Sequence, residues 1–154
     1  MAIHTRLSEQ PFDPAHELNQ FLAGRDCDGA VVSFTGLMRA SNRDGAALER
    51  LHLDWYPGMT EASIAQVAKD AQHRFNISDV LVVHRCGDIA PGEPIVFAAA
   101  AAPHRRDAFE ACDYLMDQLK TEAAFWKRED TATGSSWIEP SDTDRADAAR
   151  WSER

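Results

Sequence analysis

Hydrophobic and polar positions along the chain follow two periodicities. Short stretches rich in β-branched and aromatic residues, bounded by turn residues, predict strands, whereas apolar residues three or four positions apart predict helices. The predicted strands cover residues 29–38, 51–55, 80–85, 95–101, 125–129 and 136–139, the last two forming a hairpin. The predicted helices cover residues 14–23, 60–74, 103–121 and 142–151.

Local signals mark several element ends. Pro14 suits a first helical turn, Gly24 suits a helix stop, and Thr60 is a candidate N-cap for the second helix. Strands and helices mix without strict alternation, which predicts an α+β (mixed α/β) fold. We expect residues 1–154 to form a single compact domain with a mixed, largely antiparallel sheet, packed helices and a C-terminal β-hairpin.

Length and composition restrict the class of protein. A chain of 154 residues, 44% of them hydrophobic and 27% charged, suits one globular domain with a real core. The longest apolar run, residues 95–102, is far shorter than the about 20 residues needed to span a bilayer. The first residues contain no stretch of signal-peptide type. We therefore expect no membrane association and a cytoplasmic location.

Charge and cysteine content narrow the range of partners. The 16 Lys+Arg and 25 Asp+Glu residues give a formal net charge of −9, which disfavours a nucleic-acid partner. Cys27, Cys86 and Cys112 are widely spaced and form no C-x-x-C pair. This pattern favours reduced structural thiols over disulfides or a zinc site, and we expect all three to be buried.

Motifs typical of cofactor or metal enzymes are absent. The sequence contains no G-x-G-x-x-G, P-loop, H-E-x-x-H or G-x-S-x-G pattern, so neither a cofactor nor a metal is predicted. Asp113 and Asp117, four residues apart, are interpreted as part of a solvated helix face. His52 and His84 lie in apolar strands and are interpreted as packing histidines, and the four tryptophans as core or interface anchors.

Basic residues stand at junctions between the predicted elements. His104 and Arg105 lie where a buried strand passes into a helix, and a helix N-terminus favours anions. A solvent-exposed basic turn explains this pair equally well. Other cations occur at a strand end, beside a helical apolar stripe and on a strand where side chains alternate; these are Arg39, Lys120, Lys127 and Arg128. Together they suggest a local anion site on an acidic chain.

At these positions the sequence resembles the molybdopterin synthase catalytic (large) subunit family. The resemblance covers roughly residues 28–151 and rests on motifs in the family's order: Gly36-Leu-Met-Arg39, Tyr56-Pro-Gly-Met-Thr-Glu61, His84-Arg-Cys-Gly87, His104-Arg105, Leu119-Lys-Thr121 and Phe125-Trp-Lys-Arg-Glu129. Two positions depart from the family pattern, Met38 in place of Val and Ala124 in place of Pro. Both changes leave the charged residues in place.

The resemblance implies a sulfurtransferase of molybdenum-cofactor synthesis. Such a subunit transfers sulfur from the C-terminal thiocarboxylate of a small ubiquitin-like carrier subunit to cyclic pyranopterin monophosphate (precursor Z), which forms the dithiolene of molybdopterin. It implies a homodimer that binds two carriers as a heterotetramer. The matching motifs imply a substrate pocket lined by Leu37, Met38, Arg39, His104, Arg105, Lys120, Lys127, Arg128 and Glu129. Lys120 and Lys127 are the implied catalytic residues.

The residue types suit this chemistry. Arg39, His104 and Arg105 are reasonable ligands for a cyclic phosphate. A lysine among cations favours its neutral form, which can act as a base or attack an acyl carbon. We assign proton transfer or acyl capture to Lys120 and charge neutralisation to Lys127. The alternatives are a catalytically inactive carrier-binding scaffold of the same fold and a small phosphate-ester hydrolase. Whether a second protomer contributes to the pocket is open at this point, because residues 139–141 include no basic side chain.

Overall fold

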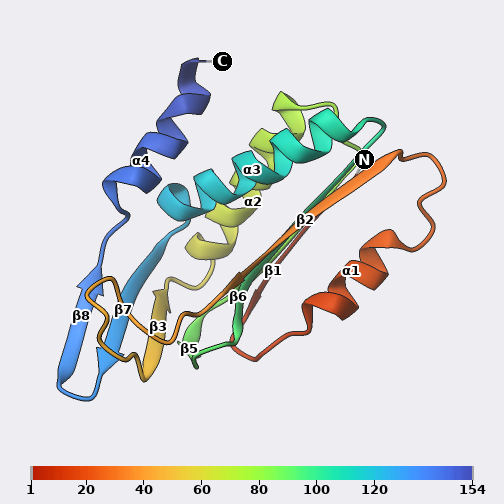
Figure 1. The fold of residues 1–154 in the computed structure, drawn as a ribbon. Coiled ribbons are helices and arrows are strands. Elements are labelled where there is room, and N and C mark those ends of the chain that lie inside the picture. The colour runs from red at the N-terminus through yellow and green to blue at the C-terminus, as the bar shows by residue number, and fades with distance from the viewer. Residues whose placement is uncertain (1, 154) are drawn as a thin grey trace.

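Two four-stranded sheets organise the computed structural model, which describes residues 2–153 (Figure 1). The first sheet has the order β1-β4-β6-β2, with β1 (Ala2–Ser8), β4 (Asp79–Arg85), β6 (Pro94–Ala102) and β2 (Ala30–Leu37). The second has the order β5-β3-β7-β8, with β5 (Gly87–Ile89), β3 (Arg50–Trp55), β7 (Phe125–Thr131) and β8 (Gly134–Ile138). The α+β class and the C-terminal hairpin are confirmed, but the strands form two sheets instead of one.

Helices cover both faces of the first sheet. α1 (Pro14–Leu22) packs on one face, and α2 (Met59–Arg74) and α3 (Arg105–Glu122) pack on the other (Figure 1). α4 (Asp142–Ala149) follows the hairpin and leads into a 3-10 turn, Arg150–Glu153. Among the described residues, no helix is both long enough and apolar enough to cross a bilayer.

The alanine-rich strand β6 lies in the middle of this layered arrangement. Residues 98–102 are all alanine and have no exposed surface. Their side chains alternate, with Ala98 and Ala100 packing toward α2 and α3, and Ala99 and Ala101 toward α1. Small side chains let both helical layers approach the sheet closely, and close packing maximises dispersion contacts in the core.

Strand directions determine which element ends meet. β6 runs antiparallel to both β2 and β4, and α3 returns along the sheet after β6. α3 therefore runs in the same direction as β2 and β4. The carboxyl ends of these three elements lie at one end of the first sheet, here called the lysine end. The start of β2 and the start of α3 lie at the opposite end, here called the His104 end.

Three local expectations are corrected by the structure. The strand β1 was not predicted, because its few apolar residues, such as Ile3 and Leu7, are four positions apart and fit a helix as well as a strand. The strand β5 was also missed, since three residues carry too little pattern. α2 begins after Gly58, so Thr60 is not its N-cap. Thr60 instead donates to the Ala124 carbonyl (2.8 Å) and ties α2 to the turn before β7.

The cysteine and carboxylate interpretations also change. Cys27 is exposed, whereas burial raises the pKa of Cys86 to about 11 and that of Cys112 to about 12. Asp113 and Asp117 are more than a solvated face. Arg150 donates to Asp113 (2.6 Å) and to Asp117 (2.7 Å), and the Trp151 indole N–H donates to Asp117 (2.6 Å). These carboxylates fasten the C-terminal segment to α3.

Gly29 tests how closely the start of β2 packs against the residue that follows β6. A Cβ atom at Gly29 would lie 2.3 Å from the Pro103 carbonyl oxygen, which is backbone and cannot rotate away. We expect Gly29→Ala to lower the free energy of unfolding by about 1–3 kcal/mol, as overpacking does, measured by urea denaturation. Gly134→Ala is the matched control, because its Cβ would have no neighbour within 4 Å. Equal midpoints for the two variants would contradict this packing.

Candidate active site

Two lysines from adjacent elements define the lysine end. Lys120 is exposed in the last turn of α3, and Lys127 is partly buried on β7, which begins three residues after α3 ends. Burial lowers the pKa of Lys127, and the nearby charge of Lys120 lowers it further. The two side chains therefore lie close enough to repel each other. The two predicted catalytic residues therefore lie near each other within a single chain.

Alternation along β7 separates the neighbouring charged residues. Lys127 and Glu129 lie on the face of β7 that also carries Phe125, whereas Arg128 lies on the opposite face. Arg128 donates to Asp130 (2.8 Å) and sits over the Trp137 ring, 5.6 Å from its centroid. Within one chain, Arg128 therefore does not line the space around Lys127. Glu129 instead raises the pKa of Lys127 and partly offsets its burial.

The tryptophans on this second sheet are not core residues. Trp126 and Trp137 are 57% and 56% exposed, whereas Trp151 is 3% exposed and packs edge-on against Phe75 and Tyr114. Of the two predicted roles, core anchor is therefore confirmed for Trp151, whereas for Trp126 and Trp137 the role of interface anchor stays a prediction.

Two charged residues that the sequence analysis missed act on the same lysines. Arg43, in the loop between β2 and β3, lowers the pKa of Lys127, and Asp144, in the first turn of α4, raises it. Burial raises the pKa of Asp144 itself, but hydrogen bonds from Ser141 and the charges of Lys120 and Arg43 outweigh this, so the pKa is lowered overall. No local sequence signal pointed to either residue, because their placement depends on how the loop and α4 pack.

The end of β2 contributes three predicted residues with different surroundings. Met38 is 4% exposed and packs in an apolar cluster with Leu51 and Leu53, and its amide donates to the Glu93 carbonyl (3.0 Å). Leu37 and Arg39, on either side of it, are exposed. Met38 therefore anchors the chain, while its two neighbours are free to contact a ligand at the lysine end.

His84 lies beneath the lysine end. It is 8% exposed, stacks on the Phe125 ring (4.4 Å between centroids, 25° between planes), and has a pKa lowered to about 4 by burial, with Lys120 contributing. The interpretation as a packing histidine is right about its burial. It missed that the ring lies near Lys120 and stacks on a residue of the strand that carries Lys127, although the motif His84-Arg-Cys-Gly87 had singled it out.

The remaining predicted residues lie at the other end of the molecule. His104 and Arg105 are exposed and line a hollow of about 380 Å³ with Gly29, Pro103 and Arg106. Arg105 and Lys120 lie fifteen positions apart on α3, a separation of about 22 Å at 1.5 Å per residue. A single chain therefore does not bring His104 and Arg105 into one pocket with Lys120 and Lys127, contrary to the expectation that all the cations converge.

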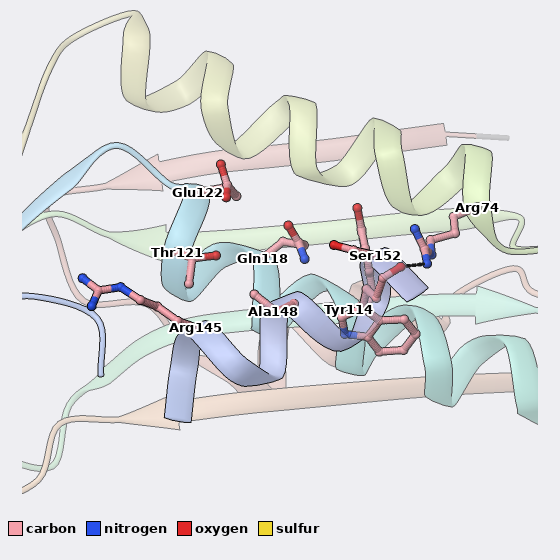
Figure 2. A pocket seen from close by; sticks show the side chains of 10 residues that line it. Arg74, Tyr114, Gln118, Thr121, Glu122, Arg145, Ala148 and Ser152 are labelled. Atoms are coloured by element: carbon pink, nitrogen blue, oxygen red, sulfur yellow. Dashed lines mark hydrogen bonds between the residues drawn. The ribbon is translucent and has the colours of Figure 1, made fainter. Parts of the chain in front are cut away.

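A second hollow lies between α3 and the C-terminal segment. This groove of about 350 Å³ is lined by side chains of both elements and by Arg74, which donates to the Trp151 carbonyl (Figure 2). Its charged residues, Glu122 and Arg145 among them, are not among the predicted site residues. Within residues 2–153, no group of three or more His, Cys, Asp or Glu side chains is arranged to hold a metal ion.

Comparison with known proteins identifies close relatives. The family model described as MoaE protein matches residues 7–122. A molybdopterin synthase catalytic subunit from Caulobacter vibrioides is 54% identical over 145 residues, which cover 94% of this chain and 95% of that protein. The solved structure of a molybdopterin biosynthesis MoaE protein from Burkholderia ambifaria is 38% identical, with a TM-score of 0.81, and covers 98% of this chain and 99% of that one.

A more distant structure shares the fold. It is a protein–protein complex of subunits 1 and 2 of molybdopterin-converting factor from Helicobacter pylori. Its matching chain is 18% identical, with a TM-score of 0.71, over 87% of this chain and 89% of that one.

The proximity of the two lysines can be tested by titration. In protein labelled at the lysine Cε carbons, NMR should show that Lys120→Gln raises the pKa of Lys127, because a repelling charge has been removed. Lys69→Gln, on the exposed side of α2, should leave the pKa of Lys127 where it is in the unaltered protein. A Lys127 pKa that does not respond to Lys120→Gln would show that the two side chains do not interact.

Proposed function

The chain belongs to the MoaE family of molybdopterin synthase catalytic subunits, and we propose that its lysine end is where sulfur is transferred to the pterin substrate. The protein is a sulfurtransferase. In the proposed reaction, sulfur comes from the C-terminal thiocarboxylate of a small carrier subunit and enters cyclic pyranopterin monophosphate. The observation that carries the proposal is the pairing of exposed Lys120 with partly buried Lys127, whose pKa is lowered.

The two lysines suit different steps. Transfer of sulfur out of a thiocarboxylate requires an acceptor for the carrier's acyl group, which is either water or an amine. Lys120 is exposed and can meet an incoming carrier terminus. The lowered pKa of Lys127 increases the fraction of neutral amine, so that it can take up a proton during the reaction. We therefore assign acyl capture to Lys120 and proton transfer to Lys127, which replaces the role of charge neutralisation expected for Lys127 from the sequence.

The phosphate ligands support a site shared between two copies. Arg39 is exposed at the lysine end, whereas His104 and Arg105 lie about 22 Å away along α3. A substrate of pterin size cannot span that distance. We propose that a homodimer places the His104 end of one copy against the lysine end of the other. Guanidinium and imidazole donors would then hold the cyclic phosphate beside the lysines.

The carrier subunit completes the proposed assembly. A thiocarboxylate is an anion, and Lys120, Lys127, Arg39 and Arg43 make the lysine end cationic on a chain of formal net charge −9. The fold is shared with a chain in the complex of subunits 1 and 2 of molybdopterin-converting factor from Helicobacter pylori. We propose a heterotetramer of two such carriers on the homodimer. The free cysteines accord with a cytoplasmic location, which we include in the proposal.

Removal of either lysine side chain should slow sulfur transfer and leave the protein folded. We expect Lys120→Ala and Lys127→Ala each to reduce sulfur transfer by at least about tenfold, since general acid–base groups contribute about 10²–10⁴-fold. The assay mixes the protein with thiocarboxylated carrier and cyclic pyranopterin monophosphate, and mass spectrometry measures the gain of two sulfurs. Lys69→Ala is the control, as an exposed lysine on α2.

The same assay separates the alternatives. Near-normal transfer by both lysine variants would refute the assignment of the site. Carrier binding without any sulfur gain by the unaltered protein would indicate an inactive scaffold, and release of free phosphate from a simple phosphomonoester would indicate a hydrolase.

Mixing two inactive variants tests the shared site. We expect Arg105→Ala and Lys127→Ala proteins to regain part of the activity when their subunits are exchanged, because one site of each mixed dimer then has both residues intact. A mixture of Lys120→Ala with Lys127→Ala is the matched control, since both changes affect the same end and every site stays incomplete. No recovery in the first mixture would place the whole site within one chain.

A further inference from the structure

His84 is a buried titratable side chain that the proposed reaction does not use. It is 8% exposed and occupies the end of β4, one of the most buried strands of the first sheet. Polar side chains at such depth are costly unless their hydrogen bonds are satisfied or they serve a function. Phenylalanine or leucine would fill the same volume at lower cost if packing were the sole requirement.

The topology brings His84 under the two lysines. Alternation along β4 places His84 on the same face as Val80 and Val82, which pack against α2 and α3. Since α3 runs in the direction of β4, its last turn, with Lys120, lies at the same end of the sheet as the end of β4, while the helix itself packs over the neighbouring strands β6 and β2. On its flat side the ring stacks on Phe125, two residues before Lys127 on the same face of β7.

Hydrogen bonding determines the tautomer of the ring. The His84 Nδ1 atom lies 2.7 Å from the Arg85 carbonyl oxygen, and a carbonyl can only accept. Nδ1 therefore carries the proton, and Nε2 presents a lone pair. Within the described part of the chain, Nε2 has no hydrogen-bond partner. Burial lowers the His84 pKa to about 4, and the Lys120 charge adds to this, so the ring is neutral near pH 7.

Charged groups around the ring come from separate elements. Lys120 faces it from α3, and Lys127 follows its stacking partner on β7. Arg85, the next residue, points to the opposite face of the sheet, where it donates to Glu93 (2.7 Å) and to the Asp88 carbonyl (2.8 Å). A neutral ring with a free lone pair adds no third positive charge beside the two lysines.

We propose that His84 is a positioning residue for Lys120: the flexible lysine side chain rotates to donate a hydrogen bond from its nitrogen to the free His84 Nε2, and is thereby directed toward the acyl carbon of the carrier. This inference rests on the proposed sulfur transfer at the lysine end. The flexible four-carbon stem of an exposed lysine otherwise samples many rotamers. A fixed acceptor beneath the side chain reduces the number of rotamers that it samples. Nothing in this arrangement requires His84 to gain or lose a proton.

Two isosteric variants separate the acceptor from the packing. His84→Gln keeps an acceptor at the position of Nε2, whereas His84→Asn keeps only a donor at the position of Nδ1. We expect the Asn variant to lose at least about tenfold in kcat with little change in the KM for carrier, and the Gln variant to stay within about threefold of the unaltered protein. Thermal unfolding reports whether either variant is folded. Equal loss in both variants, or equal activity in both, would overturn the proposal.

A spectroscopic measurement tests the hydrogen bond between Lys120 and His84 independently of whether the protein transfers sulfur. In protein with ¹⁵N-labelled histidine, Lys120→Gln should shift the His84 Nε2 resonance and leave Nδ1 protonated, because a donor to Nε2 has changed. His52, which pairs with Asp88 through Nδ1 (2.7 Å), is the internal control and should not move. An unchanged Nε2 resonance would overturn the proposal, and the absence of sulfur gain in the unaltered protein would refute only the proposed function.

Discussion

The antiparallel pairing of β6 with both β2 and β4 is the constraint on which the arrangement of this protein depends. Because α3 follows β6 and returns along the sheet, it must run in the direction of β2 and β4. The last turn of α3 therefore meets the ends of those strands, which collects Arg39, His84 and Lys120 at one end. The same geometry sends His104 and Arg105 to the far end. The buried alanines of β6 make this possible, since they let helices pack closely on both faces.

Electrostatics at the lysine end follow from partial burial of a cation next to another cation. Burial and Lys120 lower the pKa of Lys127, while Glu129 and Asp144 raise it. Both carboxylates favour the charged ammonium and partly offset its burial, and the pKa of Lys127 is still lowered overall. His84 supplies polarity without charge, since its burial keeps the ring neutral. The site thus combines a neutral imidazole with two lysines, a combination suited to acyl and sulfur transfer.

The C-terminal segment depends on a second set of interactions. Asp113 and Asp117 accept hydrogen bonds from Arg150, and Asp117 also accepts from Trp151, which holds the 3-10 turn on α3. Fixing this end positions α4, and α4 carries Asp144 to the lysines. Two carboxylates that look like solvated surface in the sequence therefore help to place a charge near Lys127, through a helix that buries no residue of its own.

The resemblance to a known family singled out Lys120 and Lys127. Local patterns in the sequence predicted strands at 29–38, 51–55, 80–85 and 95–101, each end within one residue of the observed strand, together with the helices that cover them and the hairpin. These features depend on periodicity and turn residues within a few positions, so they are readable without the fold. The strand β1, the division into two sheets, the roles of Arg43, Asp144 and His84, and the distance between His104 and Lys120 were decided only by the tertiary structure. Strand pairing determines which distant residues meet, and no pattern within one segment encodes that choice.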